Sequence, residues 1–409
     1  MDFGIQYTED QERFRKEVRA WLEANVTEEM QTPVDGRDLN DEENERHYFA
    51  WREKQRGLSK KGWLAPTMPK QYGGGGLTGE HETILQEEFA RSRVPFGNPG
   101  GFLTPALLVW ATEEQKQRFL VPILKGEVSS SQGFSEPQSG SDLASIKSTA
   151  VKDGDDWIVN GTKVFQGNSP DNAWVYGPIM TDPDAPRHRN LGFFMIPARA
   201  PGVTFLRTKT INGNRQNILY YDNVRVPGAN LIGGDHQGWQ VANTSLEQEH
   251  GGRGQAFPRD ENADNLVTYL QEIKGQANGE QALFHQEGMK AYIDAHLNGL
   301  FAKRNFGMYM ARQEMSYHGS QATMWTKIYN VENAERTRHI MKLYAMLGVL
   351  EPRALFEGRP ETYQRGSLTQ VHPGGTIEVQ KVIVARRIGI SRTQERAAPT
   401  PATATSFGS

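Results

Sequence analysis

The chain has 409 residues, with 46 lysines and arginines against 49 aspartates and glutamates, so its formal net charge is only −3. At roughly 100–200 residues per domain, this length predicts two to four domains with a sizeable core. The balanced charge argues against nucleic acid as a partner, because nucleic-acid-binding domains usually carry a basic patch. The sequence contains no cysteine, which excludes disulfides and thiolate metal sites, and no metal site is expected.

Targeting signals are also missing from the sequence pattern. No apolar run approaches the ~18 residues of a membrane-spanning helix, and the first residues lack a basic segment followed by an apolar stretch. We therefore expect no membrane insertion and no secretory signal. A cytoplasmic location is expected, and the absence of cysteine fits a reducing compartment.

The first third of the chain has a helical pattern. Thr8 and Gln11 match a capping box in front of an apolar stripe, and Thr112 and Gln115 repeat this pattern further on. Between them, four successive glycines at 73–76 interrupt the helical periodicity. These features predict several helices joined by tight turns.

From about 129 to 226, β-branched and aromatic runs alternate with turn residues, which is typical of a sandwich or barrel. The strand Trp157–Val159 leads into Asn160–Gly161, the strongest short hairpin signal, so a return strand is expected over Thr162–Phe165. Further strands are expected at 193–196, 203–206, 218–221 and 224–226.

Helical periodicity returns from Trp239 onward. Helices are expected over 259–275, 281–317, 321–347 and 376–389. Separate blocks of helices, strands and helices indicate separate layers or domains rather than an alternating parallel sheet. The low-complexity tail that ends the chain is expected to be disordered.

The most informative segment is Phe134–Asp142, which reads F-S-E-P-Q-S-G-S-D where the β region begins. Serine, glycine and proline at this density can hold an irregular loop with free backbone N–H groups. Those groups and the serine hydroxyls can bind the polar edge of a cofactor or a phosphate. From the residues alone, a capped interdomain turn is an equally good interpretation.

Five ordered motifs together resemble the acyl-CoA dehydrogenase family, and the resemblance spans nearly the whole chain. Residues 135–142 are similar to the family's T/S-E-P-x-x-G-S-D signature. The other four motifs are N-G-T-K at 160–163, P-G-V at 201–203, D-N-V-R-V-P at 222–227 and G-T-I-E-V-Q at 375–380. Each alone would be weak, but five in order are specific.

The resemblance implies an α+β multidomain fold with an N-terminal all-α domain, a middle β-barrel and a C-terminal four-helix bundle. FAD would lie between barrel and bundle, with help from a neighbouring subunit of a homo- or hetero-tetramer. The reaction would be the α,β-dehydrogenation of an acyl-CoA thioester, with an electron-transfer flavoprotein as acceptor. The implied boundaries are 1–126, 127–235 and 236–392, followed by the tail at 393–409.

Site residues follow from the matching motifs, residue by residue. The resemblance implies FAD contacts from Gln132, Phe134, Ser135, Ser141, Phe165, Gln166, Gly167, Thr376 and Glu378. Ser141 is also expected to reach the pantetheine of the substrate. Further substrate contacts are expected from Glu247, His250, Gly374 and Gly375.

The reaction needs a base for the α-proton, and a carboxylate needs an apolar pocket to raise its pKa toward neutrality. Many members of the family carry this glutamate directly before the terminal G-T, where this chain has Gly374. Another branch supplies it from the first long helix of the bundle, where this chain has Glu247 and Glu249. Two residues apart is ~200° around a helix, so only one can face the flavin. Periodicity does not choose between them, and the family match selects Glu249.

The chain also departs from the family's pattern. His250 replaces the usual arginine, Phe165 a tryptophan and Gly167 a hydroxyl residue, and the R-x-x-F-G stretch is not recognisable between 251 and 274. These departures resemble a divergent subgroup of two-chain α₂β₂ assemblies that act on bulky acyl-CoAs such as steroid side chains. Two alternatives stay open: a flavin-dependent oxidase or monooxygenase on the same fold, and a silent partner subunit that completes another chain's FAD site.

Overall fold

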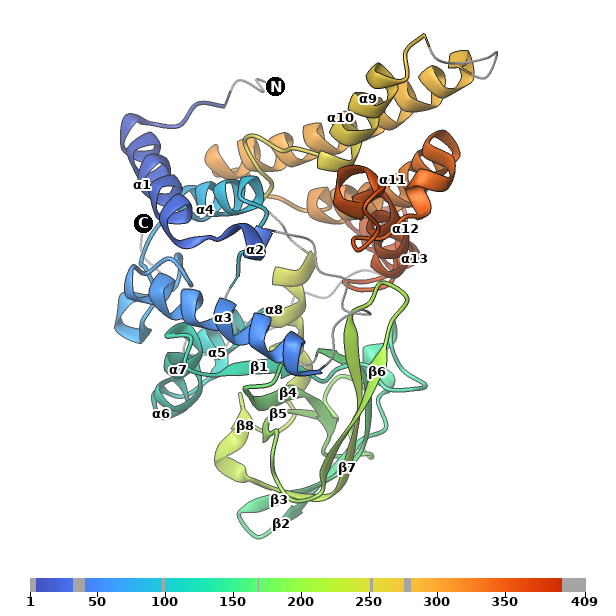
Figure 1. Ribbon diagram of the computed structural model, residues 1–409. Coiled ribbons are helices and arrows are strands. Elements are labelled where there is room, and N and C mark those ends of the chain that lie inside the picture. Colours follow the sequence, from blue (N-terminus) through green and yellow to red (C-terminus); the bar gives the residue numbers. More distant parts are fainter. Residues whose placement is uncertain are drawn as a thin grey trace.

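The computed structural model describes residues 5–31, 41–97, 100–167, 169–250, 253–275 and 281–391. Helices come first along the chain, strands follow, and helices return after the strands (Figure 1). The predicted order of helical, β and helical regions is therefore confirmed. The tail at 393–409, expected to be disordered, lies outside the described residues.

The N-terminal region is helical, as predicted, and the long segment 61–78 joins two of its helices. Both capping boxes are present, because the Thr8 hydroxyl accepts from the Gln11 backbone N–H and the Thr112 hydroxyl accepts from that of Gln115. The helices are α1 (Glu9–Asn25), α2 (Glu28–Gln31), α3 (Asp41–Lys60), α4 (Gly79–Arg91), α5 (Leu103–Trp110), α6 (Glu113–Gln115) and α7 (Val121–Leu124).

The middle region is one mixed sheet of eight strands. Its order is β6-β7-β3-β2-β4-β5-β8, and β1 pairs in parallel with β4. The strands are β1 (Ser129–Gln132), β2 (Thr149–Asp153), β3 (Asp156–Gly167), β4 (Asn172–Met180), β5 (Leu191–Pro197), β6 (Val203–Lys209), β7 (Arg215–Pro227) and β8 (Leu231–Ile232).

The predicted closed barrel is not confirmed. Among the described strands, β6 pairs only with β7, and β8 pairs only with β5, so the sheet stays open at both ends. A closed barrel needs hydrogen bonds between its first and last strands. Strand β8 has only two residues, which is too short to provide such a ladder.

The predicted hairpin at Asn160–Gly161 is wrong. Strand β3 runs through these residues without turning, and the chain reverses instead between Asp153 and Asp156. The register of β3 against β7 shifts at Gly161, which marks a bulge. A Cβ at this position would meet the Ser148 hydroxyl at 2.1 Å. Glycine is therefore needed here for a close approach and not for a turn.

The C-terminal region is helical, and the four predicted helices are found. Each ends before its predicted last residue, and α11 begins three residues earlier than predicted. One helix, α12, was not predicted. The helices are α8 (Gly238–His250), α9 (Glu261–Glu272), α10 (Gln281–Met310), α11 (His318–Met341), α12 (Arg359–Gln370) and α13 (Ile377–Arg387). Helix α11 contacts α9, α10, α12 and α13 and so lies in the middle of this region.

Shared packing and hydrogen bonds join the three regions. One buried cluster combines Leu107 of α5, Phe193 of β5 and Val241 of α8. The turn between β6 and β7 reaches α12, where the Asn212 amide donates to the Thr369 hydroxyl at 2.9 Å. These tips of β6 and β7 lie next to the red C-terminal helices in Figure 1. The junction between sheet and C-terminal helices is therefore a defined contact.

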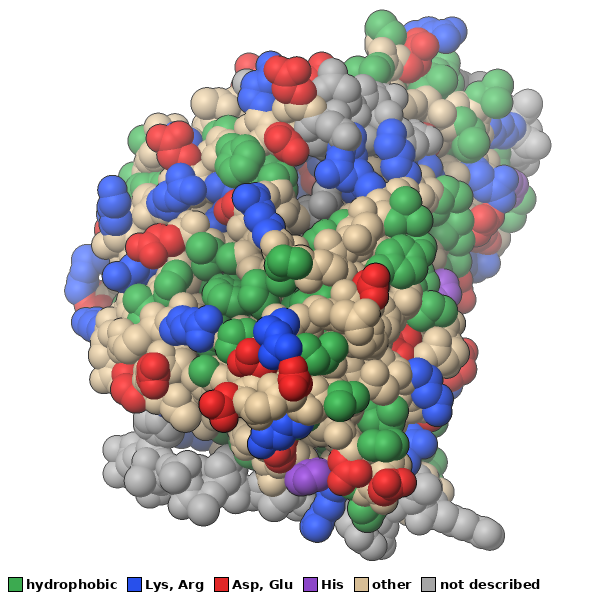
Figure 2. Space-filling model, turned by 90° about the horizontal axis from the view of Figure 1, so that it is seen from below, with side chains coloured by type: hydrophobic (Ala, Val, Ile, Leu, Met, Phe, Trp, Pro, Cys, Tyr) green, Lys and Arg blue, Asp and Glu red, His purple; other side chains and the backbone are tan. Residues whose placement is uncertain are grey.

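Both signs of charge are intermingled with hydrophobic side chains on the face seen from below in Figure 2. This distribution agrees with the nearly balanced charge of the whole chain. Within the described ranges, no helix combines the length and the apolar character that a bilayer crossing requires.

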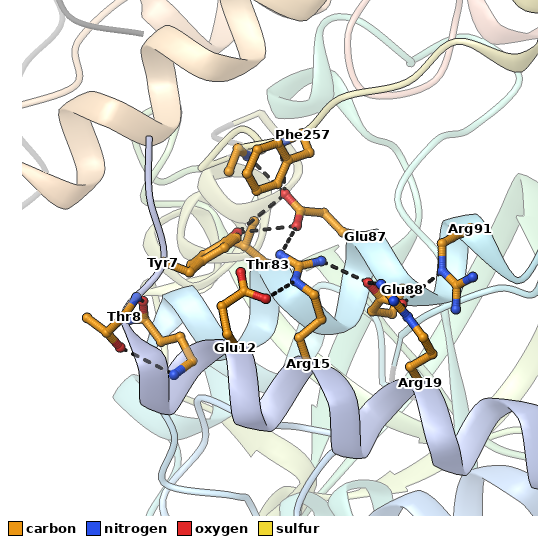
Figure 3. A network of polar contacts seen from close by, with 12 residues as sticks. Tyr7, Thr8, Glu12, Arg15, Arg19, Thr83, Glu87, Glu88, Arg91 and Phe257 are labelled. Carbon is orange, nitrogen blue, oxygen red and sulfur yellow. Dashed lines mark hydrogen bonds and ion pairs between the residues drawn. The ribbon is translucent and has the colours of Figure 1, made fainter. Parts of the chain in front are cut away.

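A buried ion-pair network joins α1 to α4 (Figure 3). The Glu88 carboxylate is only 2% exposed and accepts from Arg15 at 2.8 Å, from Arg19 at 3.0 Å and from Arg91 at 2.9 Å. Burial raises the pKa of Glu88, but hydrogen bonds and charge from the three guanidinium groups outweigh it and lower this pKa to about 2.

The lowered pKa of Glu88 predicts acid sensitivity. Its folded value lies below the usual 4.5, so its stabilising contribution is complete above pH 4.5 and is lost as the pH falls toward 2. We expect Glu88→Gln to lower the free energy of unfolding by about 3 kcal/mol at pH 7, and to flatten its decline between pH 5 and 3. Urea denaturation across this range measures both effects. Glu12→Gln, which removes a half-exposed partner of Arg15, is the control and should cost below about 1 kcal/mol.

Candidate active site

The loop at 134–142 is held by one buried ion pair. The Lys163 side chain is fully buried, and its ammonium donates to the Glu136 carboxylate at 2.9 Å. The same ammonium donates to the backbone carbonyls of Phe134 at 3.2 Å and Pro178 at 3.1 Å. The glutamate of one motif and the lysine of another, 27 residues apart, therefore form one pair that joins the loop to β3 and β4.

Backbone groups complete the surroundings of Glu136. The backbone N–H groups of Lys147 and Ser148 donate to its carboxylate at 2.6 and 3.0 Å. Burial raises the pKa of Glu136, but the Lys163 ammonium and these donors outweigh burial and keep this pKa below its usual value. Both oxygens of the carboxylate are thus satisfied in the ionised form.

Two of the segments expected to hold the cofactor lie side by side. The Val164 backbone N–H donates to the Ser135 carbonyl at 2.9 Å, which puts the loop against β3 immediately before Phe165. The Phe165 side chain is 73% exposed and its φ is +60°, a strained conformation for an aromatic residue. At Gly167 nothing lies within 4 Å of the position of a Cβ. An exposed ring and open space are features that a flat cofactor needs.

Other expected cofactor residues point inward. Phe134 packs edge-on against Tyr176 and Phe193 in the core. Gln166 is fully buried, donates to the Ser131 hydroxyl at 2.9 Å, and has no partner for its own carbonyl oxygen among the described residues. Cofactor contacts from Phe134 and Gln166 stay predictions, because both side chains are buried in this structure.

The remaining residues of the loop are more accessible. Gln132 is half-buried at the end of β1, and Ser141 is exposed. The neighbouring Asp142 pairs with Arg187 at the surface. Ser141 therefore has the accessibility that its expected contact with pantetheine requires, and that contact stays a prediction.

Thr376 and Glu378 lie at the start of α13. The Thr376 hydroxyl caps this helix by accepting from the Val379 backbone N–H at 3.3 Å. The preceding Gly374 and Gly375 have φ values of +65° and +78°. This left-handed backbone favours glycine, so a glutamate at 374 would be strained.

A buried lysine supports the turn before α13. Lys327 of α11 donates to the carbonyls of Gln370 and Pro373, the first at 2.9 Å. The Gln380 amide donates to the Gly374 carbonyl at 2.6 Å. Sequence reasoning missed Lys327, because its only local signal is a lysine at an inward position of a helix.

The predicted base belongs to the last turn of α8. The side chains of Glu247, Glu249 and His250 lie outside the described residues, so their roles stay predictions. The preceding turn is defined, since the buried Ser245 hydroxyl donates to the Phe102 carbonyl at 2.9 Å.

Carboxylates of α4 hold the chain that follows α8. Arg253 pairs with Glu82. The backbone N–H groups of Ala256 and Phe257 both donate to the Glu87 carboxylate at 3.0 Å, and Figure 3 shows Glu87 pointing at Phe257. Sequence reasoning missed Glu87, whose partners lie about 170 residues away.

The opposite side of this segment rests on α10. Gly254 has a φ of +80°, and a Cβ there would meet the Ala302 carbonyl at 2.0 Å. A cavity of about 660 Å³ lies beside it, and Phe102 and Gly374 also line this cavity. The cavity therefore brings together an expected substrate contact and the residues that flank the end of α8.

Two domain models of the acyl-CoA dehydrogenases match this chain. The N-terminal domain model matches residues 8–127, and the middle domain model matches residues 131–224. Together they cover more than half of the sequence, and the chain belongs to the acyl-CoA dehydrogenase family. It is an enzyme of this family, and FAD is its cofactor.

Relatives match along nearly the full length. The acyl-CoA dehydrogenase FadE26 of Mycobacterium tuberculosis is 29% identical over 405 residues, covering 93% of this chain and 96% of that protein. The crystal structure of the ChsE4-ChsE5 complex from Mycobacterium tuberculosis is 27% identical, with a TM-score of 0.77, and covers 95% of this chain and 100% of that chain. A variant of the Tcur3481-Tcur3483 steroid ACAD is 25% identical, with a TM-score of 0.76. The match covers 94% of this chain and 99% of that chain.

The residues of the site fit FAD. The exposed Phe165 ring and the clear space at Gly167 suit a flat ring system. Backbone N–H groups at the start of a helix can bind phosphate, and α13 begins at Ile377. The Thr376 hydroxyl already accepts from one of these groups, the N–H of Val379. The accessible Ser141 adds a hydroxyl beside the loop.

The buried pair predicts a large effect of substitution on stability. Lys163→Met leaves the Glu136 carboxylate buried and unpaired, so we expect a loss of about 3–5 kcal/mol in the free energy of unfolding and weaker retention of FAD. Arg225→Gln removes a surface ion pair on the same sheet and should cost below about 1 kcal/mol. Urea denaturation and the flavin content of the purified proteins measure these effects. Equal stability of the two variants would show that the pair does not hold the loop.

Proposed function

We propose that this chain catalyses the α,β-dehydrogenation of an acyl-CoA thioester and that Glu249 removes the α-proton. The observation that carries the proposal is the cavity beside the end of α8, which is lined by Phe102, Gly254 and Gly374. Position 374, where many family members carry the base, has left-handed backbone and no side chain. Helix α8 ends at His250, four residues before Gly254 of the cavity lining, and its last turn contains Glu247 and Glu249.

Each part of the site has a role in this proposal. FAD, when bound, supplies the acceptor at N5 for the β-hydrogen, which leaves as hydride. A Glu249 carboxylate oxygen takes the α-proton, and closure of the cavity around the thioester excludes water and favours the developing enolate. Ser141 binds pantetheine, His250 and Glu247 lie beside the substrate, and Thr376 and Glu378 face the adenosine diphosphate part of the cofactor.

The size of the cavity supports a bulky acyl group. Its volume of about 660 Å³ lies within the range of pockets that enclose whole drug-sized ligands. One similar structure is titled a steroid ACAD. We therefore include acyl groups with fused rings, such as steroid side chains, in the proposed substrate class.

An apolar stripe on α10 supports an oligomer. Seven large hydrophobic side chains of α10 are exposed among the described residues, and five of them recur at helical spacing: Met289, Tyr292, Ile293, Leu297 and Leu300. Contiguous exposed apolar surface of this kind marks interaction sites, and the similar ChsE4-ChsE5 structure is a complex. We propose that the chain forms a homo- or hetero-tetramer. The tetramer would work in the cytoplasm and pass electrons to an electron-transfer flavoprotein. Each chain would have domains at 1–126, 127–235 and 236–392.

A second candidate function is that of a silent partner subunit. One observation favours it: Phe165 is 73% exposed in a single chain, so its ring is accessible to a second chain. A pure chain without flavin that turns yellow and active only after co-expression with a second subunit would support this candidate.

The assignment of the base predicts different outcomes for two neighbouring glutamates. We expect Glu249→Gln to lower kcat by about 10²–10⁴-fold, which is the typical contribution of a positioned base. Glu247→Gln, the matched control, should stay within a few-fold of wild type. The measurement is bleaching of the bound flavin by C4, C16 and steroid CoA thioesters with an artificial acceptor. The reverse ranking would make Glu247 the base.

The proposed assembly predicts that charge on α10 separates subunits. We expect the double variant Ile293→Glu and Leu297→Glu to reduce the mass of the assembly, because buried unpaired carboxylates oppose association. Val151→Glu on β2 replaces an exposed apolar residue outside α10 and is the control. Light scattering on a sizing column measures the mass. An unchanged mass for the α10 variant would place the interface elsewhere.

A further inference from the structure

The cavity beside α8 has several polar side chains within its lining. Carboxamide and hydroxyl side chains enter from three helices: Asn298 and Asn305 of α10, Thr323, Thr326 and Asn330 of α11, and Gln370 of α12. Among the described residues that line it, none is acidic, and Lys327 is the one charged group. In ligand pockets, a small number of placed polar groups fix the orientation of the ligand and provide specificity.

The carboxamides are oriented by their partners. The Asn298 carbonyl oxygen accepts from the Thr326 hydroxyl at 2.7 Å, and the Asn330 carbonyl oxygen accepts from the Tyr363 hydroxyl at 3.2 Å. Their oxygens are thus engaged, while each amide nitrogen carries two hydrogens to donate. The Asn298 nitrogen uses one of them on the Tyr329 hydroxyl at 3.3 Å. The two side chains consequently present N–H donors.

Cross-helix hydrogen bonds hold these donors in place. The bond between Thr326 and Asn298 joins α11 to α10, and the bond between Tyr363 and Asn330 joins α12 to α11. Donors that are already oriented lose little conformational entropy when a ligand binds. A ligand atom that accepts hydrogen bonds is therefore favoured over one that donates, and the absence of acidic groups from the described lining adds to this preference.

We propose that Asn298 and Asn330 determine substrate specificity by recognising an acceptor oxygen, such as a ring ketone, on the acyl group far from the thioester. This inference rests on the proposed function, because it takes the cavity as the acyl pocket. The thioester end lies toward Phe102, Gly254 and Gly374, next to the end of α8. The ring system extends between α10 and α11, where the two amides meet its oxygen.

The test uses two CoA thioesters that differ by one oxygen. One carries a decalin-propanoyl group, and the other carries the same group with a ketone on the distal ring. We expect kcat/KM of the flavin-loaded enzyme to favour the ketone at least about tenfold, because pockets built around polar donors discriminate strongly against analogues that leave them unpaired. Asn330→Leu and Asn298→Leu should each reduce this ratio to below about threefold.

Controls separate recognition from folding. Gln364→Leu makes the same replacement on α12, where the amide bonds the Ala345 carbonyl outside the cavity lining, and it should keep the wild-type ratio. Thermal unfolding and flavin content are measured for every variant. Loss of FAD from Asn330→Leu would assign the cavity to the cofactor and overturn the inference.

Binding provides a readout that does not need turnover. The corresponding CoA thioethers cannot be dehydrogenated through a thioester enolate, and calorimetry compares their affinities for the holoenzyme. Equal affinity of the ketone and plain thioethers, or a ratio unchanged by both asparagine variants, overturns the inference. A tenfold difference in affinity without turnover of any thioester would overturn the proposed function and leave the recognition of the oxygen standing.

Discussion

The loop and strand that are expected to bind FAD depend on one ammonium group that has no access to water. Lys163 is fully buried on β3, and a buried charge is tolerated only when it is paired and hydrogen-bonded. Glu136 and the carbonyls of Phe134 and Pro178 meet this requirement together. Since they belong to the signature loop and to β4, neutralising one charge also fixes the loop against the sheet, and Ser135 is placed beside Phe165 as a result.

Two other buried charged side chains also hold irregular backbone segments around the site. Glu87 engages the backbone N–H groups of Ala256 and Phe257 after α8, and Lys327 engages the carbonyls of the turn that leads to Gly374. In each case a charged side chain on a rigid helix satisfies backbone groups of an irregular segment. Irregular backbone near the site is thus positioned by helices without forming regular structure itself, which leaves its other groups available to ligands.

Features with local causes were predictable from the sequence, and features with distant causes were not. The capping box at Thr8 follows from residues three apart, whereas Asn160–Gly161 has a hairpin signature but remains in a strand because Ser148 packs against it. Helix α12 has few apolar residues and was missed. Glu136 and Lys163 both belong to recognised motifs. Nothing in the sequence predicts that they form an ion pair across 27 residues.

The interruption between α8 and α9 explains why the cavity exists where it does. Helix α8 ends at His250 and α9 begins at Glu261. Gly254, between them, lies so close to the Ala302 carbonyl that a Cβ would meet it at 2.0 Å. A continuous helix could not make that approach, since helix axes pack 8–10 Å apart. At the break, non-helical backbone without a Cβ at Gly254 packs against α10 in place of a helix with side chains. The cavity lies between α10, α11 and α12. The same break ends α8 at His250, four residues before Gly254, which lines that space.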